Sequence, residues 1–279
     1  MKITIIGEKC IDEFVYGDCT RLNPEAPTPV FIENYRKINL GMASNVAENL
    51  VSLGGIEIVR RHQRVEIRKT RFVDETSNYI LLRADSEKNV DRIEIDKELI
   101  EHITTSDLLV VSDYDKGYLH PEDLKVVASF AKASVIDTKK PIQDIWAQEF
   151  DFIKMNSKEW SNSAHENKER YLEKAIITQG KNGAVWNGKS YKGVEAEVMD
   201  VAGAGDSFLA GFAHRWINSA GDVESAIAFG NEIAALVVKR RGVVNKIGEV
   251  AERSNAAVLK TVDCNRSGGS NPSLSALVP

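Results

Sequence analysis

Short apolar runs alternate with stretches of helical periodicity along most of this chain. The apolar runs predict buried parallel strands at 3–6, 108–111, 134–136, 152–155 and 175–178. Apolar residues spaced three and four positions apart predict helices at 43–53, 121–131, 208–217 and 226–238. Because strands and helices take turns, the pattern indicates an α/β fold with a mostly parallel sheet.

Three segments depart from this alternation. Residues 29–38 and 70–84 carry extended, hairpin-like patterns, and we expect them to form a small separate β layer. From about residue 254 the chain is rich in Ser, Asn and Gly, a composition that buries too little apolar surface to fold. The sequence therefore predicts one domain over 1–253 and a disordered tail over 254–279.

Charge and cysteine content narrow the classes of function. The 279-residue chain has a net charge of -5, whereas a nucleic-acid-binding domain usually has a basic balance. It contains no apolar stretch long enough to span a bilayer, and the apolar run at the N-terminus is too short for a signal peptide. The 3 cysteines form no C-x-x-C pair and indicate neither a disulfide framework nor a zinc site. We expect a cytoplasmic protein that acts on a small molecule, with no nucleic-acid or membrane partner.

The segment Gly203-Ala204-Gly205-Asp206 offers the most specific chemistry. Its glycines permit a sharp turn and close approach to a ligand, and the helix that follows places amides and the positive end of its dipole there. A phosphate or a developing oxyanion would bind at this turn, and Asp206 could accept a proton from an attacking hydroxyl. The alternative is an ordinary glycine-rich turn before a helix, with an acid favoured by the dipole.

Residues 200–206, Asp-Val-Ala-Gly-Ala-Gly-Asp, resemble the signature of the ribokinase (PfkB) family of carbohydrate kinases. The resemblance implies a ribokinase-like three-layer sandwich with a small β lid, taken from about 13–40 and 60–90. It also implies Asp206 as the catalytic base and an anion hole of Gly203, Ala204 and Gly205. The cofactors it implies are ATP and Mg²⁺, with a monovalent cation left open. Ala202 departs from the pattern, since the family usually has Thr there.

Two further segments resemble the family's sugar and metal motifs. Asn156 and Glu159 match its N-x-x-E motif, which implies Mg²⁺ held through water, although the same pattern often caps a helix. Residues 41–47 resemble the sugar-binding signature and imply Gly41 and Asn45 as substrate-binding residues, with Met42 in place of a second glycine. Asp12 stands where the family has an acid that binds sugar hydroxyls.

The resemblance also implies a nucleotide site. Thr178, Gly180 and Gly183 match a T-x-G-x-x-G stretch that lies beside the nucleotide, and the same residues could form a tight turn. Asn231 falls where the family lines its adenine pocket. Asp137 and Lys139 stand where a branch of the family places residues near the phosphates.

That branch is the heptose-7-phosphate kinases, which residues 21–30, 112–117 and 135–140 resemble. The likeness implies Asn23, Glu25 and Lys116 on the substrate side. A basic run at 60–71 would suit a phosphorylated sugar, although such a run is more often a solvated face. Between Gly55 and Thr70 the chain lacks a strand-helix-strand portion that longer members of the family have.

Three functions remain open at this stage. The first is an ATP-dependent kinase for a sugar or sugar phosphate similar to heptose-7-phosphate. The second is a kinase of the same fold for fructose-6-phosphate, a free hexose or a nucleoside, and the third is a catalytically weak sugar-binding regulatory protein. The family also implies a homodimer formed through the lid.

Overall fold

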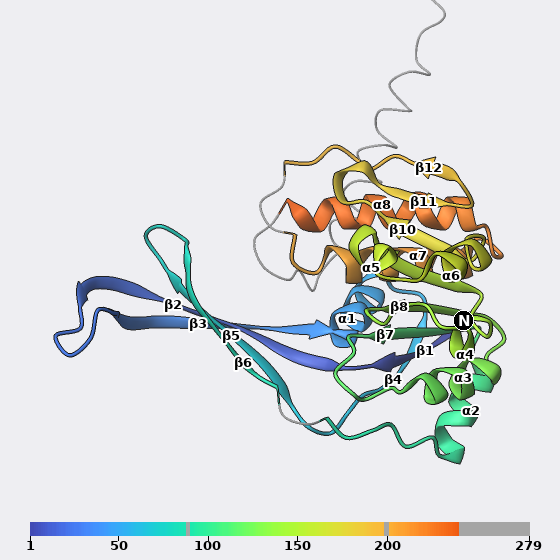
Figure 1. The fold of residues 1–279 in the computed structure, drawn as a ribbon, viewed down its shortest axis with the longest axis horizontal. Coiled ribbons are helices and arrows are strands. Elements are labelled where there is room, and N and C mark those ends of the chain that lie inside the picture. Colours follow the sequence, from blue (N-terminus) through green and yellow to red (C-terminus); the bar gives the residue numbers. More distant parts are fainter. Residues whose placement is uncertain (88–89, 198–200, 240–279) are drawn as a thin grey trace, which may run out of the picture.

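The computed structural model describes residues 1–87, 90–197 and 201–239, and its centre is an eight-stranded sheet (Figure 1). The strand order is β12-β11-β10-β9-β8-β7-β1-β4, parallel from β10 to β4 and antiparallel at β11 and β12. The strands are β1 (Lys2–Gly7), β4 (Glu57–Arg61), β7 (Leu108–Asp113), β8 (Ser134–Thr138), β9 (Phe152–Asn156), β10 (Ala175–Thr178), β11 (Ala184–Trp186) and β12 (Lys189–Tyr191). All five predicted strands are confirmed.

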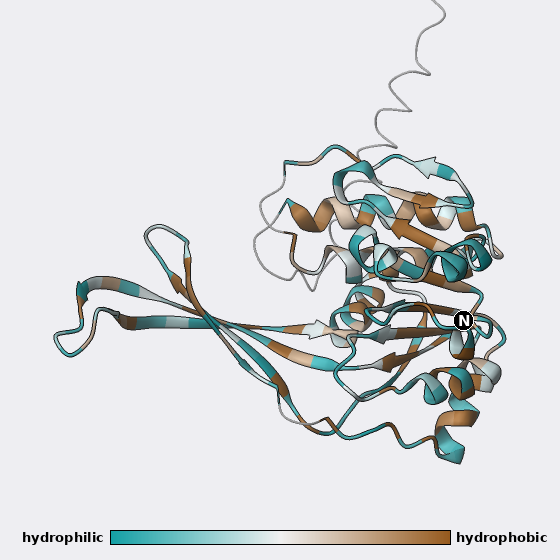
Figure 2. Cartoon of the chain, in the orientation of Figure 1, coloured by the Kyte–Doolittle hydropathy of each residue, from teal (hydrophilic) through white to brown (hydrophobic). Residues whose placement is uncertain are grey.

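Helices cover both faces of this sheet. Successive side chains of a strand point to opposite faces, and in the parallel strands the side chains on both faces are mostly apolar. Ile3 and Ile5 pack with α1 (Ala43–Leu53), α7 (Ala204–Asn218) and α8 (Val223–Val238), while Ile6 packs with α2 (Lys97–Thr105), α3 (Pro121–Ser129) and α4 (Asp144–Ala147). Figure 2 shows apolar residues along the strands of the sandwich and along α8. The remaining short helices are α5 (Ser157–Ser161), α6 (His165–Arg170) and the 3-10 turn η1 (Gly180–Asn182). The prediction of a three-layer α/β sandwich is confirmed.

A second sheet of four strands projects from the sandwich (Figure 1). Its order is β3-β2-β5-β6, formed by β2 (Lys9–Leu22), β3 (Pro29–Met42), β5 (Ile67–Asp74) and β6 (Ile80–Ser86). We call this sheet the lid. It confirms the separate β layer that the sequence predicts. Asp12 lies on strand β2 of the lid.

The lid joins the sandwich with little intervening chain. Gly7 ends β1 and Lys9 begins β2, while Met42 ends β3 and Ala43 begins α1. Between Gly55 and Thr70 the structure, which describes every residue of that stretch, contains β4 and the start of β5 and no helix. The prediction that a strand-helix-strand portion is absent agrees with this path.

Two predictions fall on residues that lie outside the described part of the chain. They are the tail over 254–279 and the role of Asp200 in the glycine-rich signature. Within the described part, no helix is both long enough and apolar enough to span a membrane.

Candidate active site

The predicted site residues gather where the parallel strands of the sandwich end. Asp137, Asn156 and Thr178 lie at the carboxyl ends of β8, β9 and β10, and the N-terminus of α7 carries Asp206 to the same edge. Open α/β sheets bind their ligands at this edge, because the loops there leave a crevice between strands and helices. The fold thus brings together segments far apart in the sequence.

Asp206 is the most constrained acid of this edge. Its side chain is buried, and both carboxylate oxygens accept hydrogen bonds: Tyr114 Oη donates to Oδ1 (2.6 Å) and Asn45 Nδ2 donates to Oδ2 (2.9 Å). Burial raises the pKa of Asp206 to about 6, against the opposing effect of these two hydrogen bonds. A carboxylate with a pKa near neutrality is suited to accept a proton and release it again.

Tyr114 reaches Asp206 because a buried acid holds its loop. Glu8, which is fully buried, accepts hydrogen bonds from the backbone N–H of Tyr114 (2.8 Å) and of Lys116 (3.0 Å). Burial and the nearby Asp113 raise the pKa of Glu8, while those N–H donors oppose the shift. Glu8 therefore fixes the loop that follows β7.

The glycine-rich turn opens α7 as predicted. Gly203 is the N-cap with φ 77 and ψ 0, a left-handed conformation that glycine adopts without a steric penalty. The amide of Ala204 donates to the carbonyl of Val201 (3.2 Å). An anion hole at this turn would therefore depend on the amides of Gly205 and Asp206, at the positive end of the helix.

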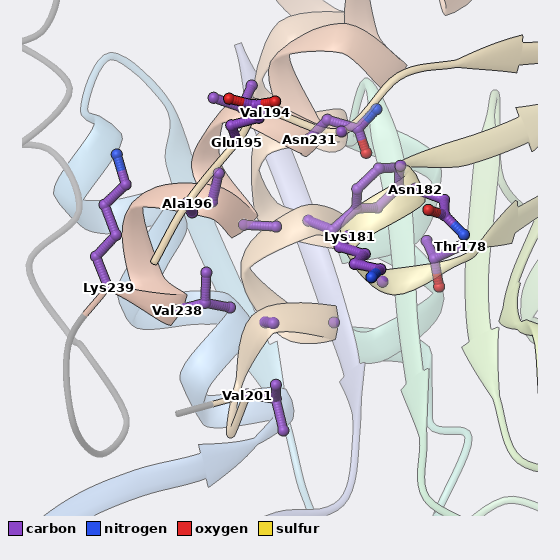
Figure 3. Close-up of a pocket in the computed structure, with 18 of the residues that line it drawn as sticks. Thr178, Lys181, Asn182, Val194, Glu195, Ala196, Val201, Asn231, Val238 and Lys239 are labelled. Atoms are coloured by element: carbon purple, nitrogen blue, oxygen red, sulfur yellow. The ribbon is translucent and has the colours of Figure 1, made fainter. Parts of the chain in front are cut away.

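A large cavity of about 1190 Å³ lies between the glycine-rich turn, α8 and the loops after β10 and β12 (Figure 3). Apolar and polar residues line different parts of it. The apolar lining includes Val194, Ala196, Val201, Phe208 and Val238. The polar lining includes Thr178, Lys181, Asn182, Asn231 and Lys239. Its size and mixed lining suit a ligand with a flat apolar part and an anionic part.

Thr178, Gly180 and Gly183 form the floor of this cavity in a tight turn. The amide of Gln179 donates to the carbonyl of Gly183 (2.7 Å), and both glycines have positive φ, 58 and 90. Asn231 is buried although it lies within α8, and its Nδ2 donates to the carbonyls of Tyr191 (3.1 Å) and Lys192 (3.3 Å). It therefore holds the chain after β12 against the cavity.

A smaller cavity of about 130 Å³ adjoins Asp206. Its lining is polar and includes Asp137, Lys139, Lys154, Asn156 and Glu159. Asn156 and Glu159 form a capping box at α5: Asn156 Oδ1 accepts from the amides of Lys158 and Glu159, and Glu159 Oε2 accepts from the amide of Asn156. The helix-capping interpretation is thus correct for these contacts.

The same pair remains compatible with Mg²⁺ held through water. Both residues line the small cavity, and the described residues contain no group of three or more His, Cys, Asp or Glu side chains arranged for direct metal binding. Mg²⁺ keeps several waters and needs few protein oxygens when phosphates supply the rest. Asn156 and Glu159 would therefore hold the ion indirectly.

On the lid side, Asp12 lies close to Gly41. A Cβ added to Gly41 would meet Asp12 Oδ2 at 2.2 Å, so the missing side chain leaves room for the carboxylate. Arg71 Nη1 of β5 lies 2.6 Å from Asp12 Oδ1, and both side chains are largely buried. The lid thus presents a paired acid and base near Asn45 and Asp206.

Two predicted substrate residues do not converge on this site, and the side chain of a third, Lys116, has an acidic partner. Asn23 and Glu25 lie in the turn between β2 and β3, at the far tip of the lid (Figure 1). Lys116 Nζ pairs with Glu87 (2.7 Å). The basic run behaves largely as a solvated face, since its arginines pair with nearby acids. The pairs with solvated arginines are Arg60–Glu48, Arg61–Asp96, Arg64–Glu94 and Arg68–Glu13. Arg71, which pairs with Asp12, is instead largely buried.

Sequence reasoning missed Glu8, Tyr114 and Lys154. Tyr114 lies inside the stretch 112–117 that resembles the heptose-7-phosphate kinases, so the sequence carried a signal for a role of this residue in the site. Lys69 of the lid and Lys139 hold their Nζ atoms 5.6 Å and 4.5 Å from the centre of the Tyr114 ring. Glu8 and Lys154 give no such signal, because only the fold shows that they are buried beside the site.

Comparison with known proteins gives one matching family model and many relatives. The model of the "pfkB family carbohydrate kinase" matches residues 62–249. The "Bifunctional protein HldE" of Bradyrhizobium diazoefficiens is 29% identical over 86% of this chain, and that of Campylobacter jejuni strain RM1221 is 32% identical over 88%. The chain spans 60% and 62% of the length of these two relatives.

Solved structures share the fold at low identity. The ribokinase of Arabidopsis thaliana complexed with ribose and ATP superposes with a TM-score of 0.64 at 14% identity, over 86% of this chain and 93% of that one. This likeness confirms the ribokinase-like fold.

Proposed function

Because this chain belongs to the pfkB family of carbohydrate kinases, we propose that it transfers the γ-phosphoryl group of ATP to a hydroxyl of a phosphorylated sugar similar to heptose-7-phosphate. The observation that carries the proposal is Asp206, a buried base with a pKa near 6 at the N-terminus of α7, between a nucleotide-sized cavity and the lid. The family supports phosphoryl transfer to a sugar hydroxyl. The particular sugar is our inference.

The reaction that we propose exchanges one P–O bond for another and moves one proton, which Asp206 later releases to solvent. Asp206 accepts the proton of the sugar hydroxyl, whose oxygen then bonds to the γ-phosphorus as the bond to the β-phosphate oxygen breaks and ADP leaves. The amides of Gly205 and Asp206 stabilise the charge of the transferring group. Asn45 and Asp12 orient the sugar, and the closed lid excludes the water that would otherwise hydrolyse ATP.

The nucleotide belongs in the large cavity in this proposal. Its apolar lining suits the adenine, Thr178 and the glycine turn lie near the phosphates, and Asn231 supports the wall after β12. Mg²⁺ held through water by Asn156 and Glu159, near Asp137 and Lys139, would neutralise phosphate charge. Dependence on a monovalent cation stays a prediction.

The choice of a phosphorylated sugar is supported by Lys69 and Lys139. Their ammonium groups approach the Tyr114 ring from the lid and from the sandwich, beside Asp206. Relatives named HldE match most of the chain, and the stretches 112–117 and 135–140 carry the same resemblance. The phosphate that the acceptor already carries could bind to these two cations, one from the lid and one from the sandwich.

A panel of acceptors tests this function. Release of ADP should be measured with heptose-7-phosphate, fructose-6-phosphate, free hexoses and nucleosides, with ATP alone as the blank. We expect the highest kcat/KM for heptose-7-phosphate. A higher value for a nucleoside or free hexose would reject the substrate class, and turnover with none of them would favour the sugar-binding regulatory protein.

Replacing Tyr114 by Phe tests the base itself. The phenol stabilises ionised Asp206, so its loss raises the pKa of Asp206. Because kcat/KM depends on the ionised base, the decline of kcat/KM on acidification should begin at a higher pH than in the parent protein. We expect the acid limb of the pH profile to move up by about one unit. The matched control is Tyr118→Phe, a buried tyrosine of the same segment outside both cavities, which should leave the limb in place. An unmoved limb in Tyr114→Phe would contradict the assignment of Asp206.

We also propose a homodimer formed through the lid. Residues that are register partners on neighbouring strands share a face of the sheet. Ile38, Glu13, Thr70 and Ala84 are such partners in turn across the four strands of the lid. Leu82 lies two positions before Ala84 on β6 and therefore shares the same face. That face is opposite to Lys69, which points to Tyr114. Ile38 and Leu82 are 57% and 58% exposed there. Large exposed apolar residues on one sheet face favour a protein partner, and a second copy of the lid has the same chemistry.

The double variant Ile38→Lys/Leu82→Lys should therefore sediment as a monomer in analytical ultracentrifugation, with its far-UV circular dichroism unchanged. Val51→Lys is the control, because Val51 is 50% exposed on α1, away from the lid, and this variant should remain dimeric. A monomeric parent protein at micromolar concentration would reject the proposal.

A further inference from the structure

Lys154 is a buried cation beside the active site with no role in the reaction proposed above. It lies on β9, two residues before Asn156, and is only 4% exposed. An ammonium in such a position is costly unless it is paired, and Asp137 Oδ2 lies 2.6 Å from its Nζ. Among the described residues Asp137 is its one hydrogen-bond partner, whereas an ammonium has three donors.

The position of Nζ points to a ligand between the two cavities. A Cβ added to Gly205 would lie 3.0 Å from Lys154 Nζ, so the ammonium rests against the glycine-rich turn of α7. Lys154 lines the large cavity and also the small cavity that holds Asp206. A group that moves from the nucleotide to a hydroxyl beside Asp206 must pass this ammonium.

A second buried lysine shows how a structural pair differs. Lys140 is 9% exposed and reaches two carboxylates, Asp113 (2.8 Å) and Asp115 (2.8 Å). Lys140 lines neither cavity. Its ammonium is held by two protein carboxylates, whereas that of Lys154 is hydrogen-bonded to one, with Glu159 and Asp206 nearby, and borders the space for the phosphates.

We propose that Lys154 is a further catalytic residue, which donates to the transferring phosphoryl group, and that Asp137 is the positioning residue that holds its Nζ. The proposal rests on the kinase function proposed above. The transition state spreads negative charge over the equatorial oxygens of the phosphoryl group. A fixed ammonium at that place stabilises this charge more than it stabilises bound ADP, which lacks the γ-phosphoryl.

The test compares Lys154→Met with the double variant Asp137→Asn/Lys154→Met. In Lys154→Met we expect kcat to fall by about tenfold to a hundredfold, with ADP affinity retained in calorimetric titration. Lys154→Met also leaves Asp137 unpaired, so its melting temperature should fall. The double variant removes that unpaired charge and should recover the melting temperature without recovering kcat. Lys140→Met is the control. Its melting temperature should fall, while kcat per folded molecule should equal that of the parent protein.

Two results separate this proposal from the kinase function. Recovery of the parental kcat in the double variant would overturn the catalytic role and leave a structural ion pair. If the parent protein turned over no acceptor, the function itself would fail, and binding would decide the inference: Lys154→Met should lose the preference for a non-hydrolysable ATP analogue over ADP. An unchanged preference would overturn it.

Discussion

Asp206→Asn should abolish most turnover while making the protein more stable. We expect kcat to fall by about 10²–10⁴-fold, the usual range for loss of a positioned general base, with ADP affinity retained. The amide still fits the site, because its oxygen can accept from Asn45 Nδ2 and its NH₂ can donate to the Tyr114 hydroxyl. The loss would therefore be chemical rather than structural.

The gain in stability follows from the pKa of Asp206. In the folded state this pKa is raised from 3.8 to about 6, so the folded protein binds more protons than the unfolded chain between these values, and stability falls as pH rises through them. At neutral pH the ionised carboxylate then costs up to roughly 3 kcal/mol. Denaturation at pH 5 and pH 7.5 should show the variant more stable than the parent, and more so at pH 7.5.

Asp123→Asn is the matched control. Asp123 is also buried, but a hydrogen bond and ion pair with Arg92 and the amide of His120 lower its pKa despite burial. Its replacement should lower stability at neutral pH and keep kcat. If Asp206→Asn kept its turnover, Asp206 would not be the base.

Gly183→Ala should disable nucleotide binding. Gly183 has φ 90 and ψ -129, which a residue with a side chain rarely adopts, and a Cβ there would lie 2.1 Å from the carbonyl oxygen of Tyr191 and 2.4 Å from the amide of Gly193. Because those atoms are backbone, the turn or the strand must move by about an ångström or more. A misplacement of that size can cost about 100-fold in rate, and we expect kcat/KM for ATP to fall by that factor.

Gly180→Ala separates the clash from the backbone conformation. Gly180 lies in the same turn with φ 58, yet a Cβ there would meet nothing within 4 Å. The left-handed conformation alone costs roughly 1–2 kcal/mol, so this variant should lose some stability and keep nucleotide affinity. An unchanged affinity for ATP in both variants would show that the loop is not the nucleotide site.

The sandwich could be predicted from the sequence because its strands are continuous apolar runs. Ile3–Ile6 and Leu108–Val111 are buried on both faces, so their pattern has no competing interpretation. The lid was harder to delimit. Its strand β2 includes the polar Asp12 and Glu13, which are buried through pairing with Arg71 and Thr70 rather than through apolar contact.

The site was predictable where the residue type itself indicates the role, as with a glycine at a left-handed turn (Gly203) or an acid in the first turn of a helix (Asp206). It was not predictable where the purpose depends on a partner distant in sequence. Tyr114 becomes a donor to Asp206 only because Glu8, 106 positions earlier than Tyr114, binds its amide. Lys154 lies within a strand that otherwise reads as apolar, and only the packing of α7 shows where its Nζ ends.

The direct junction of β3 and α1 makes the base responsive to the lid. Met42, at this junction, has φ 58, an unusual conformation for a residue with a side chain, and is packed against Cys10 and Ile67. Asn45, one turn further on, donates to Asp206. Because no loop separates β3 from α1, we expect any rotation of the lid at Met42 to move the first turn of α1, and Asn45 with it. Sugar binding to the lid would thereby change the hydrogen bond from Asn45 to Asp206, and with it the pKa of Asp206, before phosphoryl transfer.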